Sequence, residues 1–346
     1  MTPPTEIDDH LPMSVAKIFI CSILGFSFVL GIPGNSLVIW TICGRMKKRP
    51  PTVVLILHLA VADLLILLTL PVWIYSFVNH WLFGIGTCKG LVFLIYCSLY
   101  ASIFFITCLS LERYLAVSHP FVLQRWKKTM VIHLVVAMIW FFSVVLGSTI
   151  IPFQTIDDTV AGSQCVTREY ASHSQEVIHL LSETILGFVV PFFIICTCYI
   201  SVGKRICGMA SPSKQHSAKL ITSVVVIFCL CWFPHHFFNL LTVISVLLQD
   251  SNSEASETLE KISEAGAWIA GTIAFISSCI NPLLYAFAAR NIRSSAKFTK
   301  LLKLFEQVGP WEKQASNLEM PPPDKKEESW ISANIGESES TPVSSV

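Results

Sequence analysis

Residues 53–78 read VVLILHLAVADLLILLTLPVWIYSFV, an apolar run with a single carboxylate, Asp63, near its middle. A helix needs roughly 20 apolar residues to cross the hydrocarbon core of a membrane, and this run exceeds that length. It lacks the alternation of apolar and polar residues that marks a strand of an outer-membrane barrel. Six other runs share this character, so we expect an all-α fold, a seven-transmembrane helix bundle. They are Ile18–Cys43, Lys89–Val117, Met130–Phe153, Val177–Ile206, Leu220–Leu248 and Ile262–Ala288.

The composition agrees with a membrane protein and excludes other classes. Of the 346 residues, 53% are hydrophobic and 14% are charged, whereas about 25% are charged in soluble domains. The apolar content excludes a disordered chain. The net charge of +1 provides no field that would attract nucleic acid.

The distribution of charge predicts how the chain is divided. Basic residues follow spans one and three and lie between spans five and six, and the opposite loops are acidic. By the positive-inside rule, residues 1–17 form an extracellular N-terminus ahead of a membrane domain at 18–288. Residues 289–308 combine apolar and basic side chains at helical spacing, which predicts an amphipathic helix on the inner leaflet. Residues 309–346 are rich in proline, serine and acid, which predicts a disordered cytoplasmic tail.

Polar side chains at membrane depth are costly and therefore indicate function. Asp63 has two interpretations: a carboxylate that is hydrogen-bonded between helices, or a cation or proton site. The second interpretation requires oxygen partners at the same depth. Ser102, Ser277 and Asn281 are the candidates.

Three further features are weak when each is taken alone. Glu112 and Arg113 lie side by side at the cytoplasmic border of span three. Pro234 inside span six and Pro282 in span seven each remove a backbone hydrogen bond and bend a helix. Taken together and in order, however, these residues form a specific pattern.

The pattern resembles the rhodopsin-like family of G-protein-coupled receptors over roughly residues 15–305. Where the family more often has aspartate, this chain has Glu112, which keeps the charge. The resemblance implies a multi-pass plasma-membrane receptor, not an enzyme, that couples an extracellular ligand to a heterotrimeric G-protein. The matching residues are Gly34, Asn35, Asp63, Glu112, Arg113, Tyr114, Trp140, Pro191, Tyr199, Trp232, Pro234, Asn281, Pro282 and Tyr285.

The resemblance also implies an activation mechanism. Arg113 would be restrained by Glu112 at rest and released to meet the G-protein. Tyr199 and Tyr285 would swing inward as span six moves about Pro234.

Two further sites follow from the same resemblance. No cofactor is required, but Asp63, Ser102, Ser277 and Asn281 would hold an allosteric sodium ion in the inactive state. Cys88 and Cys165 would form a disulfide on the outer side.

We expect the ligand pocket in the outer halves of spans three, five and six, where residues on one face of each helix carry suitable groups. Tyrosines also fill the interiors of helix bundles, so the two on span three have that second interpretation. Span three lacks the outer-half aspartate with which the family's amine receptors hold a cation, so amine ligands are disfavoured. The predicted ligand-binding residues are Tyr96, Tyr100, His179, Glu183, Trp232, His236 and Asn239.

Local strings are most similar to the leukotriene B4 receptors, among them residues 98–102 (SLYAS) and 179–184 (HLLSET). This resemblance implies a lipid mediator as ligand, leukotriene B4 first, with an inhibitory-class G-protein and chemoattractant signalling. Gln154 and Ala267 stand where those receptors have or can carry arginines, which removes positive charge that would meet a ligand carboxylate. The carboxylate would then rely on His179, Lys89 or Arg168. A peptide or other chemoattractant is the alternative ligand. A seven-span transporter or proton pump is a remote alternative, and span seven contains no lysine.

The tail has a cluster of hydroxyl side chains among glutamates. Kinases add roughly two negative charges at such a site, so receptor kinases and arrestin are expected partners. A tail that only increases solubility is the other interpretation. The candidate phosphorylation sites are Ser338, Ser340, Thr341, Ser344 and Ser345.

Overall fold

A computed structural model describes residues 7–119, 122, 129–159, 162–206 and 212–289. All of them belong to one unit of the chain, Met1–Gly309. The predicted amphipathic helix beyond residue 289, the tail and its phosphorylation sites lie outside the described residues.

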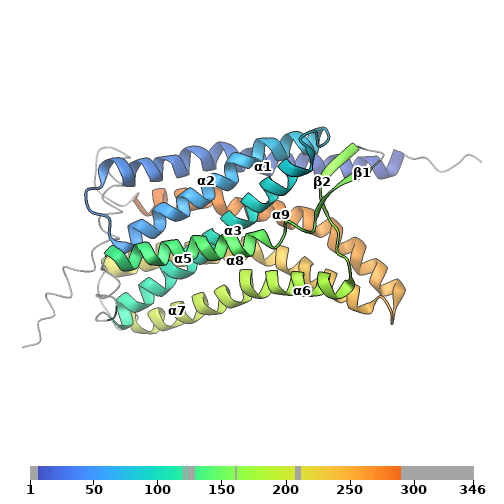
Figure 1. Ribbon diagram of the computed structural model, residues 1–346. Helices are drawn as coiled ribbons and strands as arrows, with labels where there is room; N and C mark the ends of the chain where they lie inside the picture. Colours follow the sequence, from blue (N-terminus) through green and yellow to red (C-terminus); the bar gives the residue numbers. More distant parts are fainter. Residues whose placement is uncertain (1–6, 120–121, 123–128, 160–161, 207–211, 290–346) are drawn as a thin grey trace, which may run out of the picture. The chain divides into compact units, whose positions relative to one another are not determined.

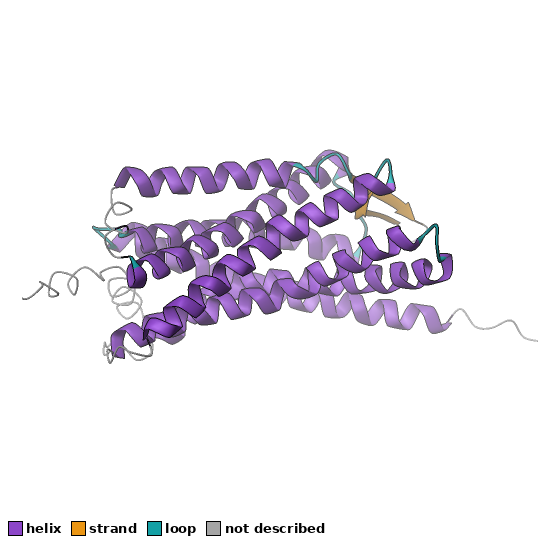
Figure 2. Cartoon of the chain, turned by 90° about the horizontal axis from the view of Figure 1, so that it is seen from below, coloured by secondary structure: helices purple, strands orange, loops and turns teal. Residues whose placement is uncertain are grey.

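The described chain is almost entirely helical, and its helices run side by side (Figures 1 and 2). Seven of its helical segments are long and apolar enough to cross a membrane, which confirms the predicted seven-helix bundle. One of these segments joins α6 to α7 through a short π-helical turn, η1. The helical elements are α1 (Ile7–Arg45), α2 (Pro51–Val78), α3 (Gly84–Ser118), α5 (Thr129–Ser148), α6 (His173–Thr184), η1 (Ile185–Val189), α7 (Val190–Ile206), α8 (Pro212–Leu248) and α9 (Ser253–Ala289).

Local sequence explains where some of these helices begin. Helix α2 starts with Pro51, whose missing N–H belongs to a position that has no intrahelical partner. Helix α6 is capped by Ser172, whose hydroxyl accepts a hydrogen bond from the Gln175 backbone N–H. Pro234 lies inside α8 and Pro282 inside α9, as predicted for spans six and seven.

Helix α3 lies at the centre of the packing. It contacts α2, α5, α7 and α8, while α9 packs against α8, α1 and α2. Two glycines allow close approach between helices. A Cβ atom at Gly34 of α1 would lie 2.8 Å from Pro282 Cβ, and one at Gly147 of α5 would lie 2.8 Å from the Cys97 backbone nitrogen.

The sequence analysis did not predict the hairpin formed by β1 (Gln154–Thr159) and β2 (Gly162–Arg168). The two strands are antiparallel, with Gln154 opposite Arg168. The apolar run of span four extends to Phe153, but its helix ends at Ser148. Of the apolar residues that follow, Ile150 is fully buried, whereas Pro152 is exposed. Hydropathy therefore predicted a longer helix than the structure contains.

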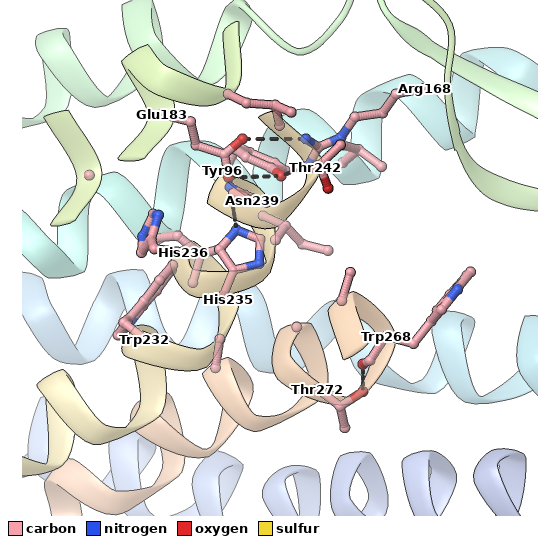
Figure 3. Close-up of a pocket in the computed structure, with 18 of the residues that line it drawn as sticks. Tyr96, Arg168, Glu183, Trp232, His235, His236, Asn239, Thr242, Trp268 and Thr272 are labelled. Carbon is pink, nitrogen blue, oxygen red and sulfur yellow. Dashed lines mark hydrogen bonds and ion pairs between the residues drawn. The ribbon is translucent and has the colours of Figure 1, made fainter. Parts of the chain in front are cut away.

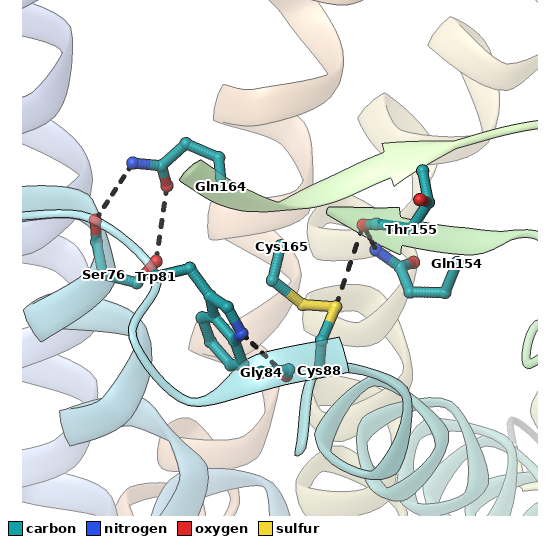
Figure 4. Close-up of a disulfide and its surroundings, with 8 residues drawn as sticks. All are labelled: Ser76, Trp81, Gly84, Cys88, Gln154, Thr155, Gln164 and Cys165. Carbon is teal, nitrogen blue, oxygen red and sulfur yellow. Dashed lines mark hydrogen bonds between the residues drawn. A yellow bond between two sulfur atoms is a disulfide. The ribbon is translucent and has the colours of Figure 1, made fainter. Parts of the chain in front are cut away.

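A disulfide attaches this hairpin to the bundle (Figure 4). Cys165 of β2 is bonded to Cys88 in the first turns of α3, with Cα atoms 5.7 Å apart, which confirms the predicted pair. The Trp81 backbone N–H also donates to the Ser163 carbonyl at 2.7 Å. The hairpin is therefore held over the end of the bundle where α1 begins (Figure 1).

The packing at Gly147 gives a test of the fold. Gly147→Ala must separate α5 from the α3 backbone, because the new methyl group meets main-chain atoms rather than a flexible side chain. We expect a loss of about 1–3 kcal/mol in stability, read as a lower melting temperature of the purified protein. Gly203→Ala is the matched control, since a Cβ atom there has no neighbour within 4 Å. Equal melting temperatures for the two variants would contradict the packing.

Candidate functional site

The predicted acid–base pair at the end of α3 is buried, with Glu112 4% and Arg113 5% exposed. Arg113 Nε lies 3.5 Å from Glu112 Oε2. The Thr52 hydroxyl of α2 donates to Glu112 Oε1 at 2.8 Å, an interaction that the sequence analysis did not anticipate. A buried charge needs such partners, so Glu112 links α2 to α3 as well as to Arg113.

Asp63 is 1% exposed and lies between three helices. Ser102 Oγ of α3 donates to Asp63 Oδ1 at 3.0 Å, and Asn281 Nδ2 of α9 donates to Oδ2 at 2.8 Å. Ser277, the third predicted partner, instead donates to the Ala274 carbonyl at 2.7 Å. The structure thus brings two of the three predicted partners to the carboxylate.

Two tyrosines were predicted to take part in activation. Tyr199 lies half-buried in α7 against the apolar cluster that surrounds Trp232. Tyr285 lies in α9, but its side chain is outside the described part of the structure.

A cavity of about 600 Å³ opens among the helices beneath the hairpin (Figure 3). Trp232 and His236 line it and stack on each other, with ring centroids 5.9 Å apart. Phe188, which is not among the lining residues, stacks on His236 at 5.0 Å. Gln154 and Ala267, where the leukotriene B4 receptors were expected to differ in charge, also line it. Six of the predicted ligand-binding residues line this cavity, namely Tyr96, Tyr100, Glu183, Trp232, His236 and Asn239.

His179, the remaining predicted ligand residue, is not among those that line the cavity. It is buried beneath Phe153, with ring centroids 4.9 Å apart, and its Nδ1 lies 3.1 Å from the Tyr170 hydroxyl. Tyr170 does line the cavity, and burial raises the pKa of its phenol, which therefore stays protonated. His179 therefore lies outside the cavity and positions Tyr170, which lines it.

Glu183 is already paired on both oxygens (Figure 3). Arg168 Nη1 of β2 donates to its Oε2 at 3.3 Å, and His235 Nε2 of α8 lies 2.8 Å from its Oε1. Arg168 also donates to the Tyr96 hydroxyl. Burial disfavours the charged guanidinium, but Tyr96 and Glu183 outweigh it and raise the pKa of Arg168, which stays cationic.

The charged residues that line the cavity are mainly acidic. Arg168 is the one lysine or arginine among the described lining residues, against four glutamates. Glu183 is neutralised by Arg168. The other three, Glu176, Glu260 and Glu264, are more exposed and come from α6 and α9.

The sequence analysis did not assign His235 to this site, and it named Arg168 only as one of three possible partners of a ligand carboxylate. His235 is adjacent to the predicted His236, but a single helical stripe admits only one of two neighbours. Arg168 closely follows Cys165, so the disulfide was the signal that this segment lies above the pocket. On the opposite wall, aromatic residues of α2 and α9 were also missed: Trp73, Phe77 and Trp268.

Comparison with known proteins identifies the family. The family model described as "7 transmembrane receptor (rhodopsin family)" matches residues 34–285. The chain belongs to this family. As a rhodopsin-family receptor it is a membrane protein with a ligand and a G-protein as partners, and not an enzyme. This assignment favours the receptor over the transporter or pump.

Several other receptors are similar to this rhodopsin-family receptor over most of its length. Leukotriene B4 receptor 1 of Homo sapiens is 31% identical over 299 residues, which cover 83% of this chain and 81% of that receptor. Atypical chemokine receptor 3 of Rattus norvegicus is 34% identical over 291 residues, covering 82% and 79%. Apelin receptor A of Danio rerio is 32% identical over 284 residues, covering 77% and 78%.

Proposed function

We propose that this receptor binds a hydroxylated lipid mediator, leukotriene B4 first, and activates inhibitory-class G-proteins in chemoattractant signalling. The observation that carries the proposal is the cavity, whose lining combines apolar side chains with hydrogen-bonding groups. Tyr100, His236 and Asn239 are among the hydrogen-bonding residues, and Leu24 and Phe275 are among the apolar ones. This arrangement suits an apolar chain that carries hydroxyl groups.

A second candidate, a ligand with basic groups such as a cationic peptide, is favoured by one specific observation. Three carboxylates line the cavity in addition to Glu183: Glu260 and Glu264, which are exposed, and Glu176, which is half-buried and within electrostatic reach of Arg168. They would attract cationic groups and repel a carboxylate. The affinity for a lipid acid should therefore be lower than in relatives with arginines at the positions of Gln154 and Ala267.

Leukotriene B4 should activate the receptor in transfected cells, and Tyr100→Phe should weaken that response. The substitution removes a buried hydroxyl and keeps the ring, so the loss should be about five- to 150-fold. The measurement is inhibition of cyclic AMP formation, with surface expression monitored. Tyr75→Phe is the control, because Tyr75 is exposed on α2 outside the cavity.

If micromolar leukotriene B4 produces no response and cationic peptides do, the lipid ligand is wrong and the cationic ligand replaces it. An unaltered response in Tyr100→Phe would show that the Tyr100 hydroxyl does not bind the ligand.

We further propose that the Asp63 site holds an allosteric sodium ion. Asp63 and Ser102 supply carboxylate and hydroxyl oxygens, the ligands that hard cations prefer. Asn281, whose Nδ2 donates to Asp63 in this structure, also carries an amide oxygen, so the residue types fit the ion. The bound ion would neutralise a charge that is otherwise costly inside the bundle. It would thereby stabilise the resting arrangement of α2, α3 and α9.

Raising sodium concentration should therefore weaken agonist binding to the wild type by roughly five-fold or more, a typical allosteric coupling. Asp63→Asn should abolish this dependence, whereas Asp157→Asn, an exposed carboxylate of β1, should retain it. The binding assay is repeated with potassium at equal ionic strength, which separates ion binding from screening. Sodium sensitivity that survives in Asp63→Asn would refute the site.

Orientation and regulation complete the proposal. We place the N-terminus outside the cell, because the hairpin and its Cys88–Cys165 disulfide lie at the end where α1 begins, and disulfides persist in oxidising surroundings. The ion pair between Glu112 and Arg113 stabilises the resting state, and activation moves α8 about Pro234. Receptor kinases and arrestin act on the tail sites.

A further inference from the structure

The cation that would meet an anionic ligand group is already paired. Arg168 projects from β2 into the cavity and lies over the Tyr96 ring, with 5.4 Å between the guanidinium carbon and the ring centroid (Figure 3). Its contact with Glu183 is one hydrogen bond of 3.3 Å rather than a two-bond fork. The Arg168 side chain is 22% exposed and that of Glu183 6%, so Arg168 is the more accessible side chain of the pair.

Glu183 has a second partner that can retain it. His235 lies 2.8 Å from the other carboxylate oxygen and comes from α8, a different helix. A carboxylate buried without any partner would be strongly destabilising, whereas one that keeps a hydrogen-bonded imidazole is tolerated. The pairing therefore permits Arg168 to leave Glu183 without exposing an isolated charge.

His235 connects this pairing to the part of α8 that bends. It directly follows Pro234, and its ring lies 6.2 Å from Trp232 and 5.0 Å from His236, centroid to centroid. Asn239 Nδ2, one turn further along α8, lies 3.5 Å from His235 Nε2. If Glu183 changes its partner, the contact with His235 transmits that change to α8 next to Pro234.

We propose that Arg168 binds the anionic group of the ligand and that Glu183 is a resident counter-ion, which this group displaces from Arg168 and leaves to His235. The proposal rests on the proposed function in one respect, that the ligand is a carboxylate. It makes an unusual prediction, since neutralising a buried pocket residue strengthens binding. Glu183→Gln removes the competitor and keeps the shape and hydrogen-bonding groups of the side chain.

The experiment measures the dissociation constants of leukotriene B4 and of its methyl ester on membranes. Glu183→Gln should tighten binding of the free acid about tenfold, and Arg168→Gln should weaken it about tenfold, each equal to about 1.4 kcal/mol. Neither variant should change binding of the ester more than about twofold. Glu169→Gln is the matched control, because it neutralises an exposed carboxylate next to Arg168 that does not line the cavity, so its effect on the acid should stay within about twofold.

Arg168→Gln leaves Glu183 with fewer partners, so folding is tested with the double variant Arg168→Gln/Glu183→Gln, which removes both charges. This variant should reach the surface and bind acid and ester equally. Weaker binding of acid and ester alike in Glu183→Gln would overturn the proposal and make Glu183 an acceptor for a ligand hydroxyl. Unchanged binding of the acid in Arg168→Gln would overturn it as well.

Failure of the proposed ligand is distinguishable from failure of this inference. If leukotriene B4 binds neither the wild type nor any variant, the proposed function is wrong. Decanoate, a simple fatty carboxylate, and its methyl ester then serve as probes for thermal stabilisation of the same purified proteins. Stabilisation by decanoate that is largest in Glu183→Gln and absent in Arg168→Gln supports the assignment, and equal shifts in all variants overturn it.

Discussion

A charge inside a membrane-spanning bundle must have a partner, and the rest of this structure depends on that constraint. Lipid cannot hydrogen-bond to backbone or side chains, so the chain crosses as helices and turns its charged residues toward one another. Glu112 is bound by Thr52, and Asp63 by Asn281. Glu183 is bound by Arg168 and His235. Each of these carboxylates joins different elements, so its partners couple the positions of those elements.

Much of the fold followed from the sequence because length and hydropathy alone decide whether a segment spans a membrane. The partners of Asp63 were partly predictable, since a buried carboxylate needs donors at its own depth. Ser277 did not fit because consecutive residues of a helix point about 100° apart. Its hydroxyl satisfies the Ala274 carbonyl, while the neighbouring Ser278 is fully buried. The sequence thus predicted the depth of these residues in the membrane, but it did not predict which of them faces Asp63.

The ligand site was predictable to a lesser extent. Tyr100, His236 and Asn239 were found because helical spacing places them on inward faces. Arg168 could be named only as one of several possible partners of a ligand carboxylate, because its position depends on the path of a loop, which folds into a hairpin and is held by the Cys88–Cys165 disulfide. No helical period describes such a segment. The same hairpin also supplies Gln154, so the part of the chain that was hardest to predict contributes to the lining of the cavity.

The central claim is that partners of buried charges hold the resting receptor, and basal nucleotide exchange tests it without any ligand. Purified receptor in lipid nanodiscs is combined with an inhibitory-class G-protein, and GTP loading is measured for the wild type, Glu112→Gln and Glu112→Gln/Arg113→Ala. The account predicts faster loading with Glu112→Gln, because Arg113 loses its counter-ion, and loading at the receptor-free rate with the double variant. Loading by well-folded Glu112→Gln at the wild-type rate would contradict it.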